Sequence, residues 1–232
     1  MNRTELKRQR QQEKRQQASQ QVSRRRLRSA AIWGLPVVLL LVVGYFVYRI
    51  FTAPTPLAGE VTEQDHVKGN PEAPVVLVEY SDFQCPACGY YAGQIQEAWP
   101  AIQDQVKFVY RHFPLTTIHD NAELAAAYAE ASGRQGKFWE MHDALFENQA
   151  QWSDLADPAD TFERYAGRLG LDLAQLREDL DSPEVQSKIR ADVRSAGQSG
   201  VNSTPSFFLN GERMNNPQTA AGFIYAIREA AQ

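Results

Sequence analysis

"VEYSDFQCPACGYY" (residues 78–91) contains Cys85 and Cys88, the only two cysteines of the 232-residue chain. A lone C-x-x-C pair is compatible with half of a zinc site, a structural disulfide or a redox centre. The pair follows an apolar run at 73–83 that is rich in β-branched residues, and it precedes a stretch able to form a helix. We therefore expect the cysteines where a strand ends and a helix begins.

A second apolar run, "QVKFVYRHF" (105–113), follows the predicted helix. Pro86 suits the first turn of that helix, where its missing N–H is not needed. Strand, helix and strand at this spacing predict a βαβ unit with two interior strands.

Residues 115–199 predict a helical insertion. Asp120 and Glu123 resemble a capping box that opens "NAELAAAYAEAS", and Gly133 ends this helix. The remaining predicted helices each have one apolar face. These faces comprise Phe138, Met141, Leu145 and Phe146; Phe162, Tyr165, Ala166 and Leu169, ending at Gly170; Leu173, Leu176 and Leu180; and Val185, Ile189 and Val193, after Ser182 and Pro183.

After Gly200 the pattern changes to "TPSFFLNGERM", a strand, a turn at Asn210-Gly211 and a strand, which predicts a hairpin. Asn216 and Pro217 are expected to cap a last helix, with Phe223, Ile224 and Ile227 facing inward. The order βαβ, helical insertion, ββα predicts an α/β protein: a thioredoxin fold with a helical insertion, over residues 62–232.

The N-terminal part has a different composition. Residues 1–29 carry ten Lys or Arg and two acids, which predicts a disordered basic tail. Twenty residues from Ser29 to Tyr48 carry no charge, which predicts one transmembrane helix at 30–51, followed by a linker at 52–61. A cleaved signal peptide is the alternative, although its apolar region is usually shorter and follows a shorter leader.

Charge predicts the orientation of that helix. Arg24, Arg25, Arg26 and Arg28 precede it and only Arg49 follows closely, which predicts a cytoplasmic N-terminus and an extracytoplasmic domain. Residues 50–232 carry 13 basic and 26 acidic residues. Such an acidic domain disfavours nucleic acid as a partner, because phosphates attract Lys and Arg.

The three interpretations of the cysteine pair differ in what they require. Zinc needs four ligands, and His66, His112, His119 and His142 lack the spacing of a ligand pair, so we expect no metal. A disulfide across two residues closes almost no loop and adds little stability. A cysteine at a helix start faces free N–H groups and the positive end of the helix dipole, which favours a thiolate. Redox chemistry is thus favoured, with Cys85 as the exposed nucleophile and Cys88 as the buried resolving thiol.

Four motifs point to one family: "GNPEAPVVLVEYSDFQCPACG", "FVYRHFPL", "GKFWEMHDALF" and "GVNSTPSFFLNG". With these motifs the chain resembles the DsbA-like thiol:disulfide oxidoreductases of the membrane-anchored bacterial group, over roughly residues 62–231. The resemblance implies that Pro205 is the cis-proline beside the active site and that Thr204 presents its backbone to the bound substrate. Pro86 and Ala87, between the cysteines, are the further expected substrate contacts.

The resemblance also makes Glu79 the buried acid that shuttles the proton of Cys88. The alternatives are a strand-edge Glu79 in water and a Pro205 that merely starts a strand. Ala87 departs from the family pattern, because the best-known oxidants have a histidine there that favours the thiolate. We therefore expect a milder oxidant. His112 and His119 are interpreted as structural or surface histidines.

Together these features predict a membrane-anchored, extracytoplasmic thiol:disulfide oxidoreductase of a bacterial cell membrane that uses no cofactor. It is expected to oxidise exported proteins with cysteine thiols and to be reoxidised by a quinone-linked membrane partner. A reductase or isomerase fed with electrons from the cytoplasm is the first alternative. A non-catalytic binding module with a thioredoxin fold is the second, which the retention of Cys85, Cys88 and Pro205 disfavours.

Overall fold

The computed structural model describes residues 40–45 and 56–232. Contacts divide the chain into two units, Met1–Pro54 and Thr55–Gln232. In the first unit the described residues are helical. Within the described ranges no helix has the length and apolar character needed to cross a membrane. The predicted tail at 1–29, most of the predicted membrane helix at 30–51 and residues 52–55 of the predicted linker lie outside the described residues.

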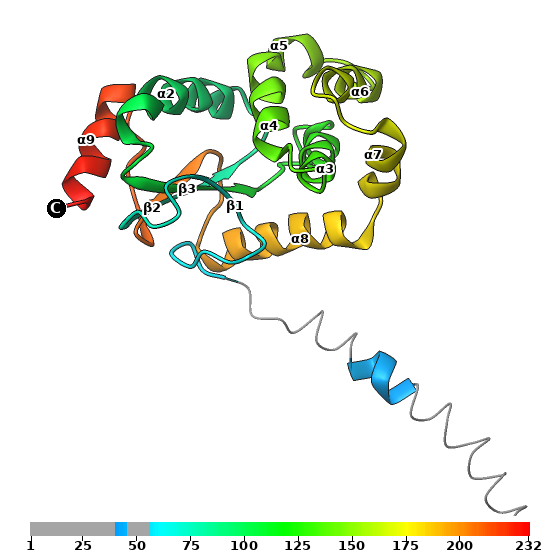
Figure 1. The fold of residues 1–232 in the computed structure, drawn as a ribbon, viewed down its shortest axis with the longest axis horizontal. Helices are drawn as coiled ribbons and strands as arrows, with labels where there is room; N and C mark the ends of the chain where they lie inside the picture. The colour runs from blue at the N-terminus through cyan, green and yellow to red at the C-terminus, as the bar shows by residue number, and fades with distance from the viewer. Residues whose placement is uncertain (1–39, 46–55) are drawn as a thin grey trace, which may run out of the picture. The chain divides into compact units, whose positions relative to one another are not determined.

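The second unit contains a mixed five-stranded sheet in the order β1-β3-β2-β4-β5 (Figure 1). Its strands are β1 (His66–Gly69), β2 (Val75–Ser81), β3 (Val106–His112), β4 (Ser206–Leu209) and β5 (Glu212–Arg213). β2 and β3 are parallel and the other neighbours are antiparallel. The two predicted interior strands are confirmed. β1 was not predicted, because its sequence HVKG has no apolar run.

Helices cover both faces of this sheet. They are α2 (Pro86–Ile102), α3 (Ala122–Gly133), α4 (Phe138–Glu147), α5 (Gln149–Trp152), α6 (Ala159–Arg168), α7 (Leu173–Leu180), α8 (Pro183–Gln198) and α9 (Ala220–Ala230). α2 and α9 lie on one face and α8 on the other (Figure 1). The sheet residues Val75, Leu77 and Phe108 pack towards α2 and α9. Val78 and Tyr80 pack with Ala196 of α8. The thioredoxin fold with a helical insertion is confirmed.

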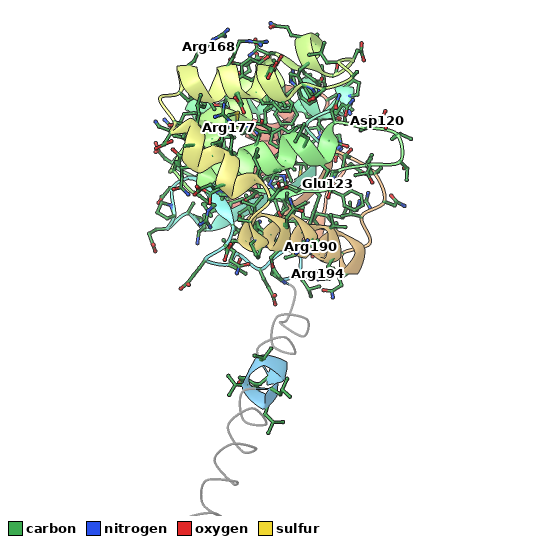
Figure 2. All side chains as sticks on the ribbon, turned by 90° about the vertical axis from the view of Figure 1, so that its right-hand side faces the viewer. Asp120, Glu123, Arg168, Arg177, Arg190 and Arg194 are labelled. Atoms are coloured by element: carbon green, nitrogen blue, oxygen red, sulfur yellow. The ribbon has the colours of Figure 1, made fainter. Side chains whose placement is uncertain are left out.

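Two predicted helix caps are wrong. Asp120 and Glu123 are exposed (Figure 2) and form no capping box. Asn121 is the N-cap of α3, and its amide Nδ2 donates to Leu155 O at 2.8 Å. Asn216 does not cap α9, because its side chain donates to Pro205 O at 2.9 Å. Thr219 is the cap instead, with its hydroxyl accepting from the N–H of Gly222. In both cases a different residue close by in the sequence, Asn121 or Thr219, occupies the N-cap position.

The predicted apolar faces are largely buried, with one exception in α8. Ser182 caps this helix and Pro183 starts it, as predicted. Val185 and Ile189 are buried, but Val193 is 37% exposed. Asp192 and Ala196 occupy the inward positions instead, since a helical turn of 3.6 residues carries the apolar face past Val193.

The predicted hairpin turn at Asn210 and Gly211 is confirmed. Both residues have positive φ, 50° and 85°, as a two-residue turn of the primed type requires. The turn leads from β4 into β5. The segment before β4, which contains Thr204, lies beside Cys85 at the start of α2. That neighbourhood contains the candidate site.

Candidate active site at the start of α2

Both cysteines lie at the start of α2. Cys85 is the N-cap residue and Pro86 takes a first-turn position, as the sequence predicted. Cys88 is one turn further along and is completely buried. Cys85 was expected to be exposed, but it is only 8% exposed, so this expectation was wrong in degree. Pro86 and Ala87 are exposed beside it.

The insertion and the loop before β4 cover Cys85. From α5, the amide Nε2 of Gln149 donates to the carbonyl oxygens of Phe83 at 2.7 Å and Cys85 at 2.9 Å. From the other side, Cys85 Sγ lies 3.6 Å from Thr204 O. The peptide bond between Thr204 and Pro205 is cis, as expected. The geometry expected of this segment is confirmed, while its part in substrate binding stays a prediction.

The two thiols have opposite electrostatic environments. A hydrogen bond from Cys88 lowers the pKa of Cys85 to about 5, with further help from Thr204 and the N–H groups of Ala87 and Cys88, although partial burial opposes the shift. The Thr204 hydroxyl has no other hydrogen-bond partner among the described residues and is available to the Cys85 thiolate. Burial, followed by the interactions with Cys85 and with the Glu79 carboxyl, raises the pKa of Cys88 well above its ordinary value. At neutral pH the pair therefore holds one thiolate and one thiol.

Glu79 lies beneath the cysteines on β2 and is 1% exposed. Its Oε1 atom has no hydrogen-bond partner within the described part of the chain. Burial raises the pKa of this carboxyl to about 8, so that it is mostly protonated at neutral pH. The structure thus places Glu79 in the interior rather than at a wet strand edge.

Asp82 connects the loop after β2 to the insertion. Its backbone N–H points at Cys88 Sγ, 3.5 Å away. Its carboxylate accepts from the N–H of Leu115 at 2.9 Å and lies 2.7 Å from His119 Nδ1. His119 is thus close to the site but already has a partner.

His112, Glu130 and Asp192 offer potential metal ligands within 4.8 Å of one another, all buried. These atoms have protein partners: His112 Nε2 lies 2.7 Å from Glu130 Oε1, and Lys188 Nζ lies 2.7 and 2.8 Å from the two carboxylate oxygens of Asp192. The Lys188 ammonium supplies positive charge where a metal ion would otherwise do so.

Asp82, Gln149 and His142 belong to the site although no sequence pattern predicted them as site residues. Asp82 and Gln149 act through backbone contacts that depend on tertiary structure, and no local pattern reveals them. His142 offered a signal, because it lies four residues after Phe138 on the inward face of α4. A polar residue on the buried apolar face of a helix is unusual and indicates a structural or functional role.

A family described as Thioredoxin matches residues 61–229. The chain therefore belongs to the thioredoxin family, and it has the DsbA-like form of the fold. The DsbA-like fold supports thiol:disulfide oxidoreductase activity in general, and the C-x-x-C pair of this chain stands at the start of α2.

Solved structures agree with this assignment. A thioredoxin-like oxidoreductase from Silicibacter pomeroyi is 29% identical, with a TM-score of 0.62, covering 73% of this chain and 93% of the other. BdbD from Bacillus subtilis in its oxidised form is 23% identical, with a TM-score of 0.64, covering 77% and 99%. A variant of alpha-DsbA1 from Wolbachia pipientis is 20% identical, with a TM-score of 0.66, covering 76% and 96%. The last two similarities concern the fold alone.

Curated relatives have a different name. "Na(+)/H(+) antiporter NhaA 3" of Salinispora tropica is 43% identical over 174 residues, and "Na(+)/H(+) antiporter NhaA 1" of Mycobacterium sp. strain KMS is 41% identical over 169 residues. These matches cover 72% and 71% of this chain but 25% and 26% of the relatives. The chain thus spans about a quarter of the length of these proteins.

Proposed function

We propose that this protein oxidises thiols of exported proteins with a catalytic disulfide between Cys85 and Cys88. The observation that carries the proposal is the opposite pKa shift of the two thiols, since the pKa of Cys85 is lowered to about 5 and that of Cys88 is raised. Such a division suits a dithiol with one good leaving group and one buried resolving thiol.

In the proposed reaction a substrate thiolate attacks Cys85 Sγ and breaks the Cys85–Cys88 bond. Cys88 leaves as a thiolate and takes the proton of the neutral Glu79 carboxyl. A second substrate thiolate then attacks the substrate sulfur of the mixed disulfide, which releases Cys85 as a thiolate. The substrate loses two electrons, the enzyme gains them with one proton on Cys88, and one proton passes to solvent.

Substrate contact is assigned to the surface around Cys85. Pro86 and Ala87 are exposed beside it, and Thr204 presents its backbone 3.6 Å from Cys85 Sγ. We propose that a substrate cysteine binds along Thr204 and Pro205, with its neighbouring residues resting on Pro86 and Ala87.

The proposed direction of the reaction is supported by the stability of the Cys85 thiolate. At pH 7 a pKa near 5 in place of 9 stabilises the folded dithiol by roughly 2 kcal/mol, after a discount for partial exposure. For a two-electron couple this makes the disulfide more oxidising by roughly 40 mV. The shift arises without a histidine at position 87, because Cys88, Thr204 and backbone N–H groups supply it.

The cellular setting is proposed from the sequence. A transmembrane helix at 30–51 would hold the domain at the outer side of a bacterial cell membrane, where a quinone-linked membrane partner reoxidises it. Sodium–proton exchange is not part of the proposal, because the match to the antiporters covers a quarter of their length. A reductase or isomerase remains the alternative, and the stabilised Cys85 thiolate disfavours it.

The test uses the full chain in its oxidised form with a reduced, unfolded protein as substrate. We expect disulfides to form in that protein at the expense of the Cys85–Cys88 disulfide. Cys88→Ala, first converted by oxidised glutathione to a mixed disulfide at Cys85, should pass to a mixed disulfide with the substrate protein and stay there, because the resolving thiol is absent, and Cys85→Ala should form none. Mass spectrometry after acid quenching distinguishes these species. If the oxidised chain forms no disulfides in that protein, while the reduced chain reduces the disulfides of its oxidised form, the result would support the reductase.

A further inference from the structure

A cavity of about 240 Å³ lies between α2 and α4 and extends to the sheet. Glu79 and Phe108 line it from the sheet, Trp99 from α2, Lys68 from β1, and His142 and Asp143 from α4. A smaller cavity of about 100 Å³ adjoins it, since His142 and Asp143 line both. A buried water occupies on the order of 10 to 15 Å³ by this measure, so the larger cavity has room for several waters.

Two residues that line this cavity each have a buried polar atom without a protein partner in the described part of the chain. These atoms are Glu79 Oε1 and His142 Nε2, and neither has a hydrogen bond to any of the described residues. Glu79 is 1% exposed and His142 is 6% exposed. Buried polar groups in folded proteins are normally satisfied, by ordered water where no protein group is available. The cavity therefore has both the room and the polar lining to hold water between Glu79 and His142.

Hydrogen bonding fixes the orientation of the His142 ring. His142 Nδ1 lies 2.8 Å from Asp143 Oδ1, so that the ring donates its Nδ1 proton to the carboxylate and leaves Nε2 as a hydrogen-bond acceptor. Burial lowers the pKa of His142, which leaves the ring neutral at neutral pH, although Asp143 opposes this shift. Asp143 Oδ2 lies 3.4 Å from Lys68 Nζ, and both side chains reach solvent, with 39% and 31% exposed.

The charged and titratable groups around His142 come from four elements. Asp143 is on α4, Lys68 on β1, His112 and Tyr110 on β3 and Glu79 on β2. The side chains that α2 contributes to the cavity are uncharged. Glu79, His142 and Asp143 thus line the same cavity, and Asp143 is the one of the three that reaches solvent.

We propose that the cavity is a hydrated proton route in which His142 and Asp143 carry protons between Glu79 and solvent. This inference rests on the proposed function and adds the outlet for its proton. When the enzyme disulfide re-forms, the neutral Glu79 carboxyl first releases its proton, and the carboxylate then takes the proton of Cys88. Cys88 attacks Cys85 of a mixed disulfide, whose other sulfur leaves as a thiolate, so that one proton leaves the site in total. Glu79 passes the proton through water to His142 Nε2, and His142 releases its Nδ1 proton to Asp143 and solvent. The opposite half-reaction uses the same route inward. His142 is a positioning and relay residue; it does not touch the sulfur.

The test follows the reduced full chain during oxidation by oxidised glutathione. Attack by Cys85 forms a mixed disulfide with glutathione, and Cys88 then resolves it, so that acid quenching and mass spectrometry give two separate rate constants. His142→Phe should slow the second step about tenfold at pH 7, because proton transfer by a placed group contributes at least this much, and should leave the first step unchanged. Imidazole at roughly 100 mM should restore most of the second rate in His142→Ala and should not change the wild type.

Two further variants serve as controls. Phe146→Leu alters packing at 5.0 Å from the His142 ring without removing a proton carrier, and both steps should stay within about twofold of the wild type. Asp143→Asn leaves the core intact and should slow the second step about threefold, which keeps the test available if the His142 variants do not fold.

Three results would overturn the proposal. They are an unchanged second step in His142→Phe, or in Asp143→Asn if the former does not fold; equal slowing of both steps; and an equal response to imidazole in the wild type. A wild-type chain that forms no mixed disulfide at all would instead contradict the proposed function, so that the two failures are distinguishable.

Discussion

The two faces of the central sheet bury ionisable groups in different ways. On the face towards α8, Arg111 is completely buried and bonds Asp65 through two nitrogens, at 3.0 and 2.9 Å. A third nitrogen of Arg111 donates to the hydroxyls of Tyr80 at 3.0 Å and Ser195 at 3.1 Å. On the face towards α2 and α4, Glu79 is equally buried, but its Oε1 atom has no partner among the described residues.

This difference separates a structural role from a chemical one. Burial alone would raise the pKa of Asp65, but the hydrogen bond from Arg111 and the charge of Lys188 hold it below its usual value. No cation or strong hydrogen bond among the described residues offsets the burial of Glu79, so its pKa is raised to about 8. A paired charge holds its protonation state fixed, whereas an unpaired carboxyl near neutrality can exchange its proton. The unsatisfied face is therefore the one suited to proton transfer.

The largest expected effect comes from breaking the paired face. Arg111→Met leaves Asp65 buried without its partner, which should lower the free energy of unfolding by about 3 to 5 kcal/mol. Urea unfolding of the full chain measures the loss, and exchange activity per folded molecule should be unchanged. Arg177→Met is the matched control, because Arg177 pairs with Glu163 on the surface (Figure 2), and it should leave stability unchanged. Equal losses in the two variants would remove the distinction between the pairs.

Glu79→Gln should have opposite effects on stability and activity. Because the folded pKa of Glu79 lies above its ordinary value of 4.5, the stability that this group contributes is complete below pH 4.5 and is lost as the pH rises through about 8. Relative to the reduced wild type, the variant should gain about 1.4 kcal/mol per pH unit across that window. Its resolution of a mixed disulfide should be about a hundredfold slower. Parallel stability curves for the two proteins would contradict the buried-carboxyl assignment.

A smaller effect concerns α8, which contributes Lys188, Asp192 and Ser195 to the paired face. Ser182 caps this helix by accepting from the N–H of Val185 at 3.3 Å. Ser182→Ala should cost about 1 kcal/mol of unfolding free energy. Asp120→Ala should cost nothing measurable, since Asp120 is exposed and caps no helix. A loss in Asp120→Ala as large as in Ser182→Ala would favour the capping box that the structure lacks.

The sequence predicts elements well where burial has a local period. The apolar runs of β2 and β3 and the Asn210-Gly211 turn belong to this kind. The short, mixed strand β1 and the caps of α3 and α9 depend on contacts with distant segments, such as the bond from Asn216 to Pro205 O, and were missed or misplaced.

The same division applies to the site. Cys85, Cys88, Pro205 and Glu79 have motifs or positions that identify them in the sequence. The contact of His142 with the Glu79 cavity requires α4 to lie against β1 and α2, which no local pattern specifies.

The reduction potential of the Cys85–Cys88 disulfide tests most directly whether the stabilised thiolate makes this protein an oxidant. Equilibration of the full chain with reduced and oxidised glutathione at pH 7, followed by acid quenching and mass spectrometry, gives the value. We expect it between about −270 mV, as in thioredoxin, and about −120 mV, as in DsbA, and nearer to the latter. A potential at or below that of thioredoxin would contradict the oxidising function and would favour a reductase.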